Sequence, residues 1–204
     1  MAIPRPDRPV GVLDACVLIP AGLRDVLLSC AHESAFRPVW QDEILDEVLR
    51  NTVRLLKDRS GVSEEAATAS AAYTLEQMAR AFPDACQASE TWVPLVPELS
   101  CDDKDRHVLA VALGAKATHL VTDNARDFPP VSVPRGLAVV SPDRFLLELL
   151  AAVPDQVVDA VEGMSDRLKQ PRKTSAELAE QMAKGRHIPE FGDKLGRILA
   201  ECAS

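Results

Sequence analysis

The segment "CDDKDRHVLAVALGAKATHLVTDNARDFP", residues 101–129, carries five aspartates on a chain segment that is otherwise small and apolar. Its spacing predicts a helix over Asp103–Leu113, followed by a turn and then a strand over His119–Thr122. A buried helix and a buried strand do not ordinarily have carboxylates at both ends. The aspartates therefore indicate either helix caps and turns or a site for a divalent metal ion.

Strands alternate with helices on both sides of this segment. Further strands are expected at Val10–Leu13, Phe36–Trp40 and Leu137–Val140, and further helices at Leu18–Cys30, Gln41–Asp58, Ser63 to Pro83 and Asp143–Val153. A loop or a short edge strand is expected between Pro94 and Cys101. This alternation predicts an α/β fold in which helices cover both faces of a parallel sheet.

The pattern changes after Pro154, because only helical signals remain. One of them is a capping box in which Thr174 is followed three residues later by Glu177. We therefore expect a main domain at residues 1–153 and a small helical appendage at residues 154–204. Acidic and basic residues nearly balance in this C-terminal region, which favours contact with protein over contact with RNA.

The composition is typical of a soluble protein of one principal domain: 204 residues, of which 47% are apolar. The five cysteines are odd in number and contain no CxxC pair, which argues against disulfides and structural zinc and favours a reducing cytoplasm. The N-terminus has no signal-like pattern. The most apolar run, residues 145–153, is short and interrupted by Glu148, so we expect no membrane segment.

Three of the carboxylates follow predicted strands. Asp14 ends the first strand, Asp123 ends the strand over 119–122, and Asp127 lies on the loop behind it. The carboxyl ends of parallel strands meet at one edge of a sheet, and ligands bind there. Carboxylates gathered at such an edge repel one another unless a proton or a cation relieves them. Oxygen ligands without histidine or cysteine favour Mg²⁺ or Mn²⁺ over zinc.

Two helices carry the other candidate acids. Glu47 lies at the border of an apolar stripe, where its side chain can reach a cleft. Asp105 falls in the first turn of the helix in the opening segment. Asp102 and Asp103 are better explained as helix caps than as metal ligands, although Asp102 remains a candidate site residue.

The net charge of −8 at first sight disfavours a nucleic-acid partner. Metal ions held by the acidic residues would return positive charge where a phosphate binds. Basic residues also cluster locally, for instance at Lys184, Arg186 and His187. Beside the carboxylates, three side chains could contact RNA phosphates, although a solvated surface explains them equally well: Lys104, Arg106 and Arg126.

Four blocks of the sequence together resemble a known family. "VLDACVLIPAGLRDVLL", "WQDEILDEVLRN", "DDKDRHVLAVAL" and "LVTDNARDFP" occur in the order and approximate spacing of PIN domains, and they are most similar to PIN-domain toxins of the VapC type. The resemblance covers roughly residues 10–150. It implies a PIN-like three-layer α/β/α fold and a Mg²⁺-dependent endoribonuclease, with Mn²⁺ as a substitute. It also implies an RNA substrate, a small antitoxin partner and a homodimer.

The resemblance also implies roles for individual residues. Asp14 matches the first acid of the family, Glu47 the helical acid and Asp105 the central acid, so that Asp14, Asp105 and Asp127 would hold the metal ion while Glu47 polarises the attacking water. The last block matches less well. We rank Asp127 first as the final ligand, with Asn124 as a neutral ligand or orienting group, and Asp123 stays an open alternative. Cys16 departs from the family pattern, and we expect its thiol to pack.

Two other functions stay open at the level of sequence. A phosphatase with an aspartyl nucleophile would use Asp14 but usually has a second acid two residues later, where this chain has Cys16. A non-catalytic PIN-like domain that binds RNA or protein is the other alternative. The nearly complete set of acids argues against it.

Overall fold

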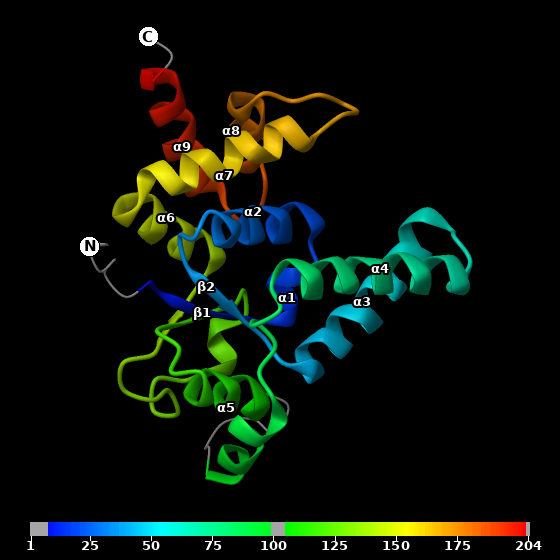
Figure 1. Cartoon of the computed structure of the whole chain (residues 1–204), viewed down its shortest axis with the longest axis vertical. Coiled ribbons are helices and arrows are strands. Elements are labelled where there is room, and N and C mark those ends of the chain that lie inside the picture. Colours follow the sequence, from blue (N-terminus) through cyan, green and yellow to red (C-terminus); the bar gives the residue numbers. More distant parts are fainter. Residues whose placement is uncertain (1–7, 99–104, 203–204) are drawn as a thin grey trace.

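A computed structural model describes residues 8–98 and 105–202 of the chain (Figure 1). Its described part contains a parallel sheet of four strands in the order β2-β1-β3-β4: β1 (Val10–Leu13), β2 (Arg37–Val39), β3 (His119–Val121) and β4 (Ala138–Val140). Val12 of β1 pairs with Val39 on one side and with Leu120 on the other. Because the strands are parallel, their carboxyl ends lie along one edge. The predicted parallel sheet is confirmed.

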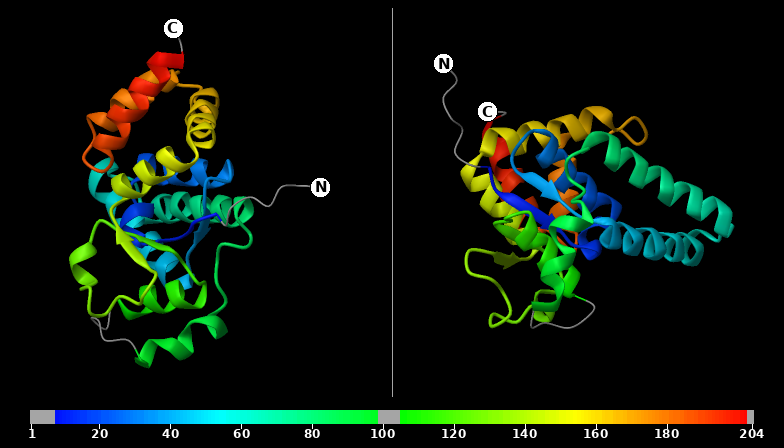
Figure 2. Two further views of the ribbon diagram at one scale, coloured as in Figure 1. Left: turned by 90° about the vertical axis from the view of Figure 1, so that its left-hand side faces the viewer. Right: turned by 60° about the horizontal axis from the view of Figure 1, so that its bottom comes forward.

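Helices cover both faces of this sheet, as the sequence predicted. α2 (Ala21–His32) and α6 (Pro142–Ala152) lie on one face and α5 (Arg106–Gly114) lies on the other, which makes three layers (Figures 1 and 2). α3 (Asp42–Ser60) and α4 (Glu64–Ala81) pair as a hairpin that projects from the body of the molecule. The three-layer α/β/α fold is confirmed.

Gly11 of β1 packs closely against the side of the sheet that α2 and α6 cover. A Cβ atom at this position would lie 3.2 Å from ring atoms of both Phe36 and Phe145. Both rings are fully buried, and they meet edge to face with their centroids 4.9 Å apart. Glycine therefore gives β1 the space to lie directly against the aromatic pair.

Several helices begin or end at residues with the appropriate capping chemistry. Ser63 accepts a hydrogen bond from the Ala66 amide and caps α4, and Gly61 ends α3 in the left-handed conformation with a φ of 60°. Ser141 caps α6, whose first residue is Pro142. The helices accordingly lie close to their predicted ranges, because cap chemistry depends on neighbours in sequence.

The structure differs from the prediction in two segments. The helix expected over residues 18–30 is present as α2, which begins at Ala21, and a one-turn helix that was not predicted, α1 (Ala15–Leu18), precedes it. Pro20 lies between the two helices and has no amide hydrogen to continue α1. The loop or edge strand expected after Pro94 is instead a 3-10 helix, η2 (Val93–Glu98), which packs against α5 and follows the short η1 (Ser89–Thr91). A proline in the first turn is compatible with such a helix because that turn needs no amide donor.

The C-terminal region is helical, as expected, and it packs on the main domain. Its helices are α7 (Pro154–Arg167), α8 (Ser175–Ala183) and α9 (Pro189–Cys202). α7 lies along α2, and α9 packs against α8 and α6 (Figure 1). Asp143 of α6 accepts the amide hydrogens of Glu190 and Phe191 at 3.3 and 2.8 Å and thereby caps α9.

The crossing of α8 and α9 leaves no space for a side chain at Gly192. A Cβ atom there would lie 2.3 Å from the backbone nitrogen of Ala183. Phe191 and Leu195 beside it are fully buried.

The capping box predicted at Thr174 and Glu177 is present at the start of α8. None of the helices in the described residues is long and apolar enough to cross a membrane.

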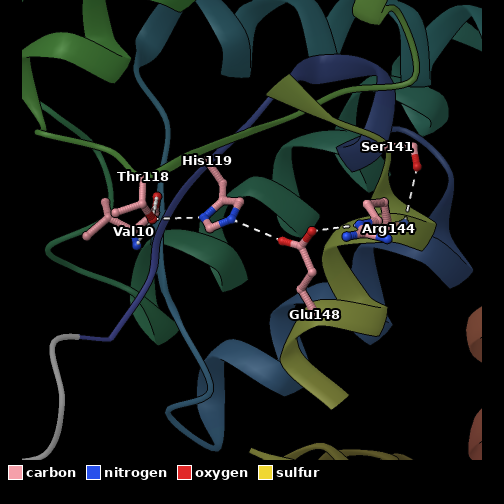
Figure 3. Close-up of polar contacts among 6 residues, drawn as sticks. All are labelled: Val10, Thr118, His119, Ser141, Arg144 and Glu148. Atoms are coloured by element: carbon pink, nitrogen blue, oxygen red, sulfur yellow. Dashed lines mark hydrogen bonds and ion pairs between the residues drawn. The ribbon is translucent and has the colours of Figure 1, made fainter. Parts of the chain in front are cut away.

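A polar network at the amino edge of the sheet joins β3 to α6 (Figure 3). His119 contacts the Thr118 hydroxyl at 2.8 Å and Glu148 at 3.2 Å, and Glu148 also accepts from Arg144 at 2.7 Å. The imidazole further lies against the ring of Phe145, with centroids 5.1 Å apart. His119 is therefore a packing residue, and its contacts lie at the amino ends of the strands.

Replacing His119 by alanine should lower the free energy of unfolding by about 2 kcal/mol, because a largely buried ring loses both its packing and its polar partners. Arg144→Ala is the matched control. It removes only an exposed pair with Glu148 and should cost less than about 0.5 kcal/mol. Urea denaturation of the two variants measures both values, and equal destabilisation would contradict the assignment.

Candidate active site

Asp14 occupies the carboxyl end of β1, where its carboxylate is held by three donors. Oδ1 accepts the amide hydrogen of Ala15 at 2.7 Å, which makes Asp14 the cap of the one-turn helix α1. Oδ2 accepts from the hydroxyl of Thr122 at 2.7 Å and from the thiol of Cys16 at 3.1 Å. The half-buried carboxylate therefore has a fixed orientation at the edge of the sheet.

Thr122 and Cys16 also hold the segment that follows β3. The amide of Asn124 donates to the Thr122 hydroxyl at 3.0 Å, and the amide of Asp123 donates to the Cys16 sulfur at 3.3 Å. Asp127 ends the short 3-10 helix η3 (Ala125–Asp127), and its amide donates to the Asn124 carbonyl at 2.9 Å. The ends of β1 and β3 thus form one connected unit.

Cys16 is a hydrogen-bond donor in this unit. Burial raises the pKa of its thiol to about 12, and the adjacent Asp14 carboxylate acts in the same direction. The thiol consequently keeps its proton at neutral pH and can donate it to Asp14. The sequence predicted that this thiol packs, and its polar contacts with Asp14 and Thr122 were not anticipated.

Glu47 lies half-buried on α3, where its Oε1 is 3.5 Å from the amide nitrogen of Asn51. α3 is anchored by the buried Gln41, whose Oε1 accepts the amide hydrogen of Ile44 at 3.0 Å. The Gln41 amide nitrogen in turn lies 2.6 Å from Nδ1 of His107 in the first turn of α5. Gln41 and His107 therefore connect the helix of Glu47 to the helix that begins after Asp105. Neither was a candidate in the sequence.

The other predicted site residues that the structure describes lie at the start of α5 and on η3. Asp105 is half-buried and directly precedes α5, its carbonyl accepting the amide hydrogen of Val108 at 3.1 Å. Arg106 opens α5, and Arg126 is exposed on η3. Asp102, Asp103 and Lys104 lie outside the described residues.

Asp123 makes a contact that the sequence did not suggest. Its Oδ2 lies 2.8 Å from Nδ1 of His187, in the connection between α8 and α9. Arg186 donates through Nε to Nε2 of the same imidazole at 3.1 Å. Since Nε2 accepts, Nδ1 carries the hydrogen that bonds to Asp123. The C-terminal region therefore reaches the carboxyl edge of the sheet.

The donor set suits a hard cation. Asp14, Glu47, Asp105 and Asp127 offer only carboxylate oxygens, and Asn124 adds an amide oxygen. Within residues 8–98 and 105–202, no three carboxylates, histidines or cysteines are grouped closely enough to hold a metal ion together. Mg²⁺ does not require such a group, because it commonly binds one or two carboxylates and completes its shell with water and phosphate. The residues present therefore fit Mg²⁺.

The profile of the PIN domain matches residues 11–126, which is more than half of the chain. The match includes the first three blocks described above and the fourth block as far as Arg126, so Asp127 lies just beyond it. The chain belongs to the PIN-domain family. A second profile, the VapC50 C-terminal domain, matches residues 142–197, from the start of α6 into α9.

One curated relative of this PIN protein comes from Mycobacterium tuberculosis and is named "Putative ribonuclease VapC50". It is 32% identical over 106 residues, which are 52% of this chain and 62% of the relative. The match thus spans less than two thirds of the relative's length. No solved structure matches the chain.

The raised pKa of Cys16 has a measurable consequence. At pH 8 a thiol of pKa about 12 is ionised in only about one molecule in ten thousand. Iodoacetamide should therefore leave Cys16 unmodified in the folded protein and alkylate it at the ordinary rate in urea, as read by mass spectrometry of peptides. Rapid alkylation of Cys16 in the folded protein would contradict the donor role.

Proposed function

We propose that this PIN protein is a Mg²⁺-dependent endoribonuclease and the toxin of a toxin–antitoxin pair. The observation that carries the proposal is the carboxylate of Asp14, which Thr122, Cys16 and the Ala15 amide orient at the carboxyl edge of the sheet. The name of the relative, a ribonuclease of the VapC series, supports RNA as the substrate.

Asp14, Asp105 and Asp127 are the proposed metal-binding residues, with Asn124 as an additional oxygen donor or orienting group. Because no three such side chains in the described residues are close enough to hold an ion together, one or two of them would bind Mg²⁺ directly and the others through its water molecules. Asp123 is less suited to this role because its carboxylate is engaged with His187. The bound ion would supply positive charge for the scissile phosphate and a water of lowered pKa. Thr122 and Cys16 hold Asp14 in one orientation, which limits the reorganisation required when the phosphate binds.

Glu47 is proposed to accept a proton from the attacking water. Its Oε1 lies within reach of Asn51, which leaves Oε2 as the oxygen that receives the proton. The water oxygen forms the new bond to phosphorus while the bond to the 3′-oxygen breaks. The 3′-oxygen takes up a proton from solvent, so that the products carry a 5′-phosphate and a 3′-hydroxyl.

The partners proposed for this chain follow from its similarity to VapC-type PIN toxins. A VapC-type toxin acts in the cytoplasm beside a small antitoxin protein, and we propose both for this protein, together with a homodimeric assembly. Arg106 and Arg126 are the proposed phosphate contacts near the carboxylates, on α5 and η3 respectively.

Asp14→Asn should reduce RNA cleavage by at least about a hundredfold, since the amide keeps the shape of the side chain but removes its charge. The rate is measured on a labelled single-stranded RNA with Mg²⁺. Asp159→Asn, an exposed aspartate on α7, is the control and should retain the wild-type rate. Folded wild-type protein that is free of antitoxin and cleaves no RNA with Mg²⁺ or Mn²⁺ would refute the proposed function.

Mg²⁺ that binds only the folded protein should raise the free energy of unfolding of the wild-type protein. The increase should be about 3 kcal/mol when the free Mg²⁺ concentration is a hundred times the dissociation constant. Asp14→Asn should lose most of this stabilisation, while Asp159→Asn should keep it. Differential scanning calorimetry with and without Mg²⁺ measures the effect. An identical shift in wild-type protein and Asp14→Asn would remove Asp14 from the metal site.

A further inference from the structure

The connection between α8 and α9 and the start of α2 enclose a hollow of about 240 Å³. Pro20, Gly22 and Leu23 line it from the main domain, and Met182, Arg186 and His187 line it from the C-terminal region. Both parts of the chain are therefore needed to form it. A larger hollow of about 680 Å³ lies between α2, α4 and the α7–α8 segment, and Gly22 borders both.

The smaller hollow is connected to the Asp14 site by direct contacts. Asp14 accepts from Cys16, whose sulfur accepts from the Asp123 amide, and the Asp123 side chain holds His187. On the other wall, only the one-turn helix α1 and Ile19 separate Asp14 from Pro20. α1 lies at the carboxyl edge of the sheet (Figure 1), so the contacts of Cys16, Asp123 and His187 join the lining of the hollow to the edge that carries Asp14.

Arg186 provides positive charge at this border. The side chain is exposed, and its Nε donates to His187 at 3.1 Å. Among the described residues, no carboxylate pairs with its guanidinium. In a chain with a net charge of −8, such an arginine beside a carboxylate site is suited to an anionic ligand.

The other walls suit a base. Pro20, Leu23 and Met182 are apolar, and His187 presents an imidazole ring. Single-stranded RNA is commonly recognised through bases that leave the stack and lie against histidine or arginine side chains. A volume of about 240 Å³ is below the range of about 300–1,000 Å³ that is usual for drug-sized ligands, so it suits one base.

We propose that this hollow is a nucleotide subsite for the RNA strand next to the scissile bond, with Arg186 holding a phosphate and the apolar wall holding a base. His187 is a positioning residue that Asp123 fixes in place. The subsite rests on the proposed ribonuclease function and extends it, because it assigns the C-terminal region a part in substrate binding. Charge balance over that whole region favours protein contact, whereas the local placement of Arg186 favours RNA.

Binding rather than cleavage tests the subsite, so every variant is made in the Asp14→Asn background. The probe is a fluorescein-labelled single-stranded RNA of mixed sequence, and anisotropy gives its dissociation constant at several salt concentrations. Arg186→Ala should weaken binding about fivefold and reduce the slope of log affinity against log salt by about 0.7, the value for one lost phosphate contact on a single strand. Arg197→Ala, an exposed arginine of α9 outside the hollow, should change neither.

Gly22 allows an independent test of the base-binding wall. A Cβ atom at Gly22 meets no other atom within 4 Å, so a larger side chain can enter the space without displacing the backbone. Gly22→Leu should weaken RNA binding about fivefold, comparable to the loss of one stacked base, with an unchanged salt slope. Gly22→Ala is the matched control and should bind RNA as the Asp14→Asn protein does.

The outcomes separate the two proposals. If the folded wild-type protein cleaves no RNA with Mg²⁺ or Mn²⁺, the ribonuclease function and the subsite both fail. If the wild-type protein cleaves RNA but the folded Asp14→Asn protein binds none, or if neither Arg186→Ala nor Gly22→Leu weakens the binding, the subsite alone is refuted. Unchanged RNA binding is also the result expected if the hollow receives a protein segment, so that outcome likewise overturns the proposal.

Discussion

The hydrogen bond from the buried Thr122 hydroxyl to the Asp14 carboxylate is the contact on which the rest of this site depends. It joins the ends of β1 and β3, two neighbouring strands whose sequences lie more than a hundred residues apart. A hydrogen bond to a charged group contributes about 1.5–3 kcal/mol, and losing it would leave a buried polar atom unpaired. Because the same hydroxyl accepts from Asn124, the loop after β3 has a fixed position relative to Asp14.

The C-terminal helices extend this arrangement beyond the sheet. α7 packs on α2 and α9 packs on α6, so their positions depend on the same helices that cover the sheet. Asp143 caps α9 at one end of this contact, and Asp123 holds His187 at the other. The region is therefore integrated into the molecule, and its α8–α9 connection borders the candidate site.

Predictions from sequence succeeded where the physical cause is local. The helix of α3 follows from its apolar spacing and from Gly61, and α6 follows from Ser141 and Pro142. They were less accurate at the start of α2. The helix expected over residues 18–30 formed, but Pro20, which has no amide hydrogen, separates it from the one-turn helix α1 that was not predicted.

The amino-acid sequence by itself determined the parallel α/β architecture and the candidate acids. The spacing of apolar residues in strands and helices and the four family blocks can both be read directly from the order of the residues. It did not determine which polar side chains meet. Thr122 binding Asp14, Gln41 binding His107 and His187 binding Asp123 join residues 64 to 108 positions apart. Such pairs leave no periodic signal, since they arise only when packed helices and strands bring distant segments within hydrogen-bonding distance.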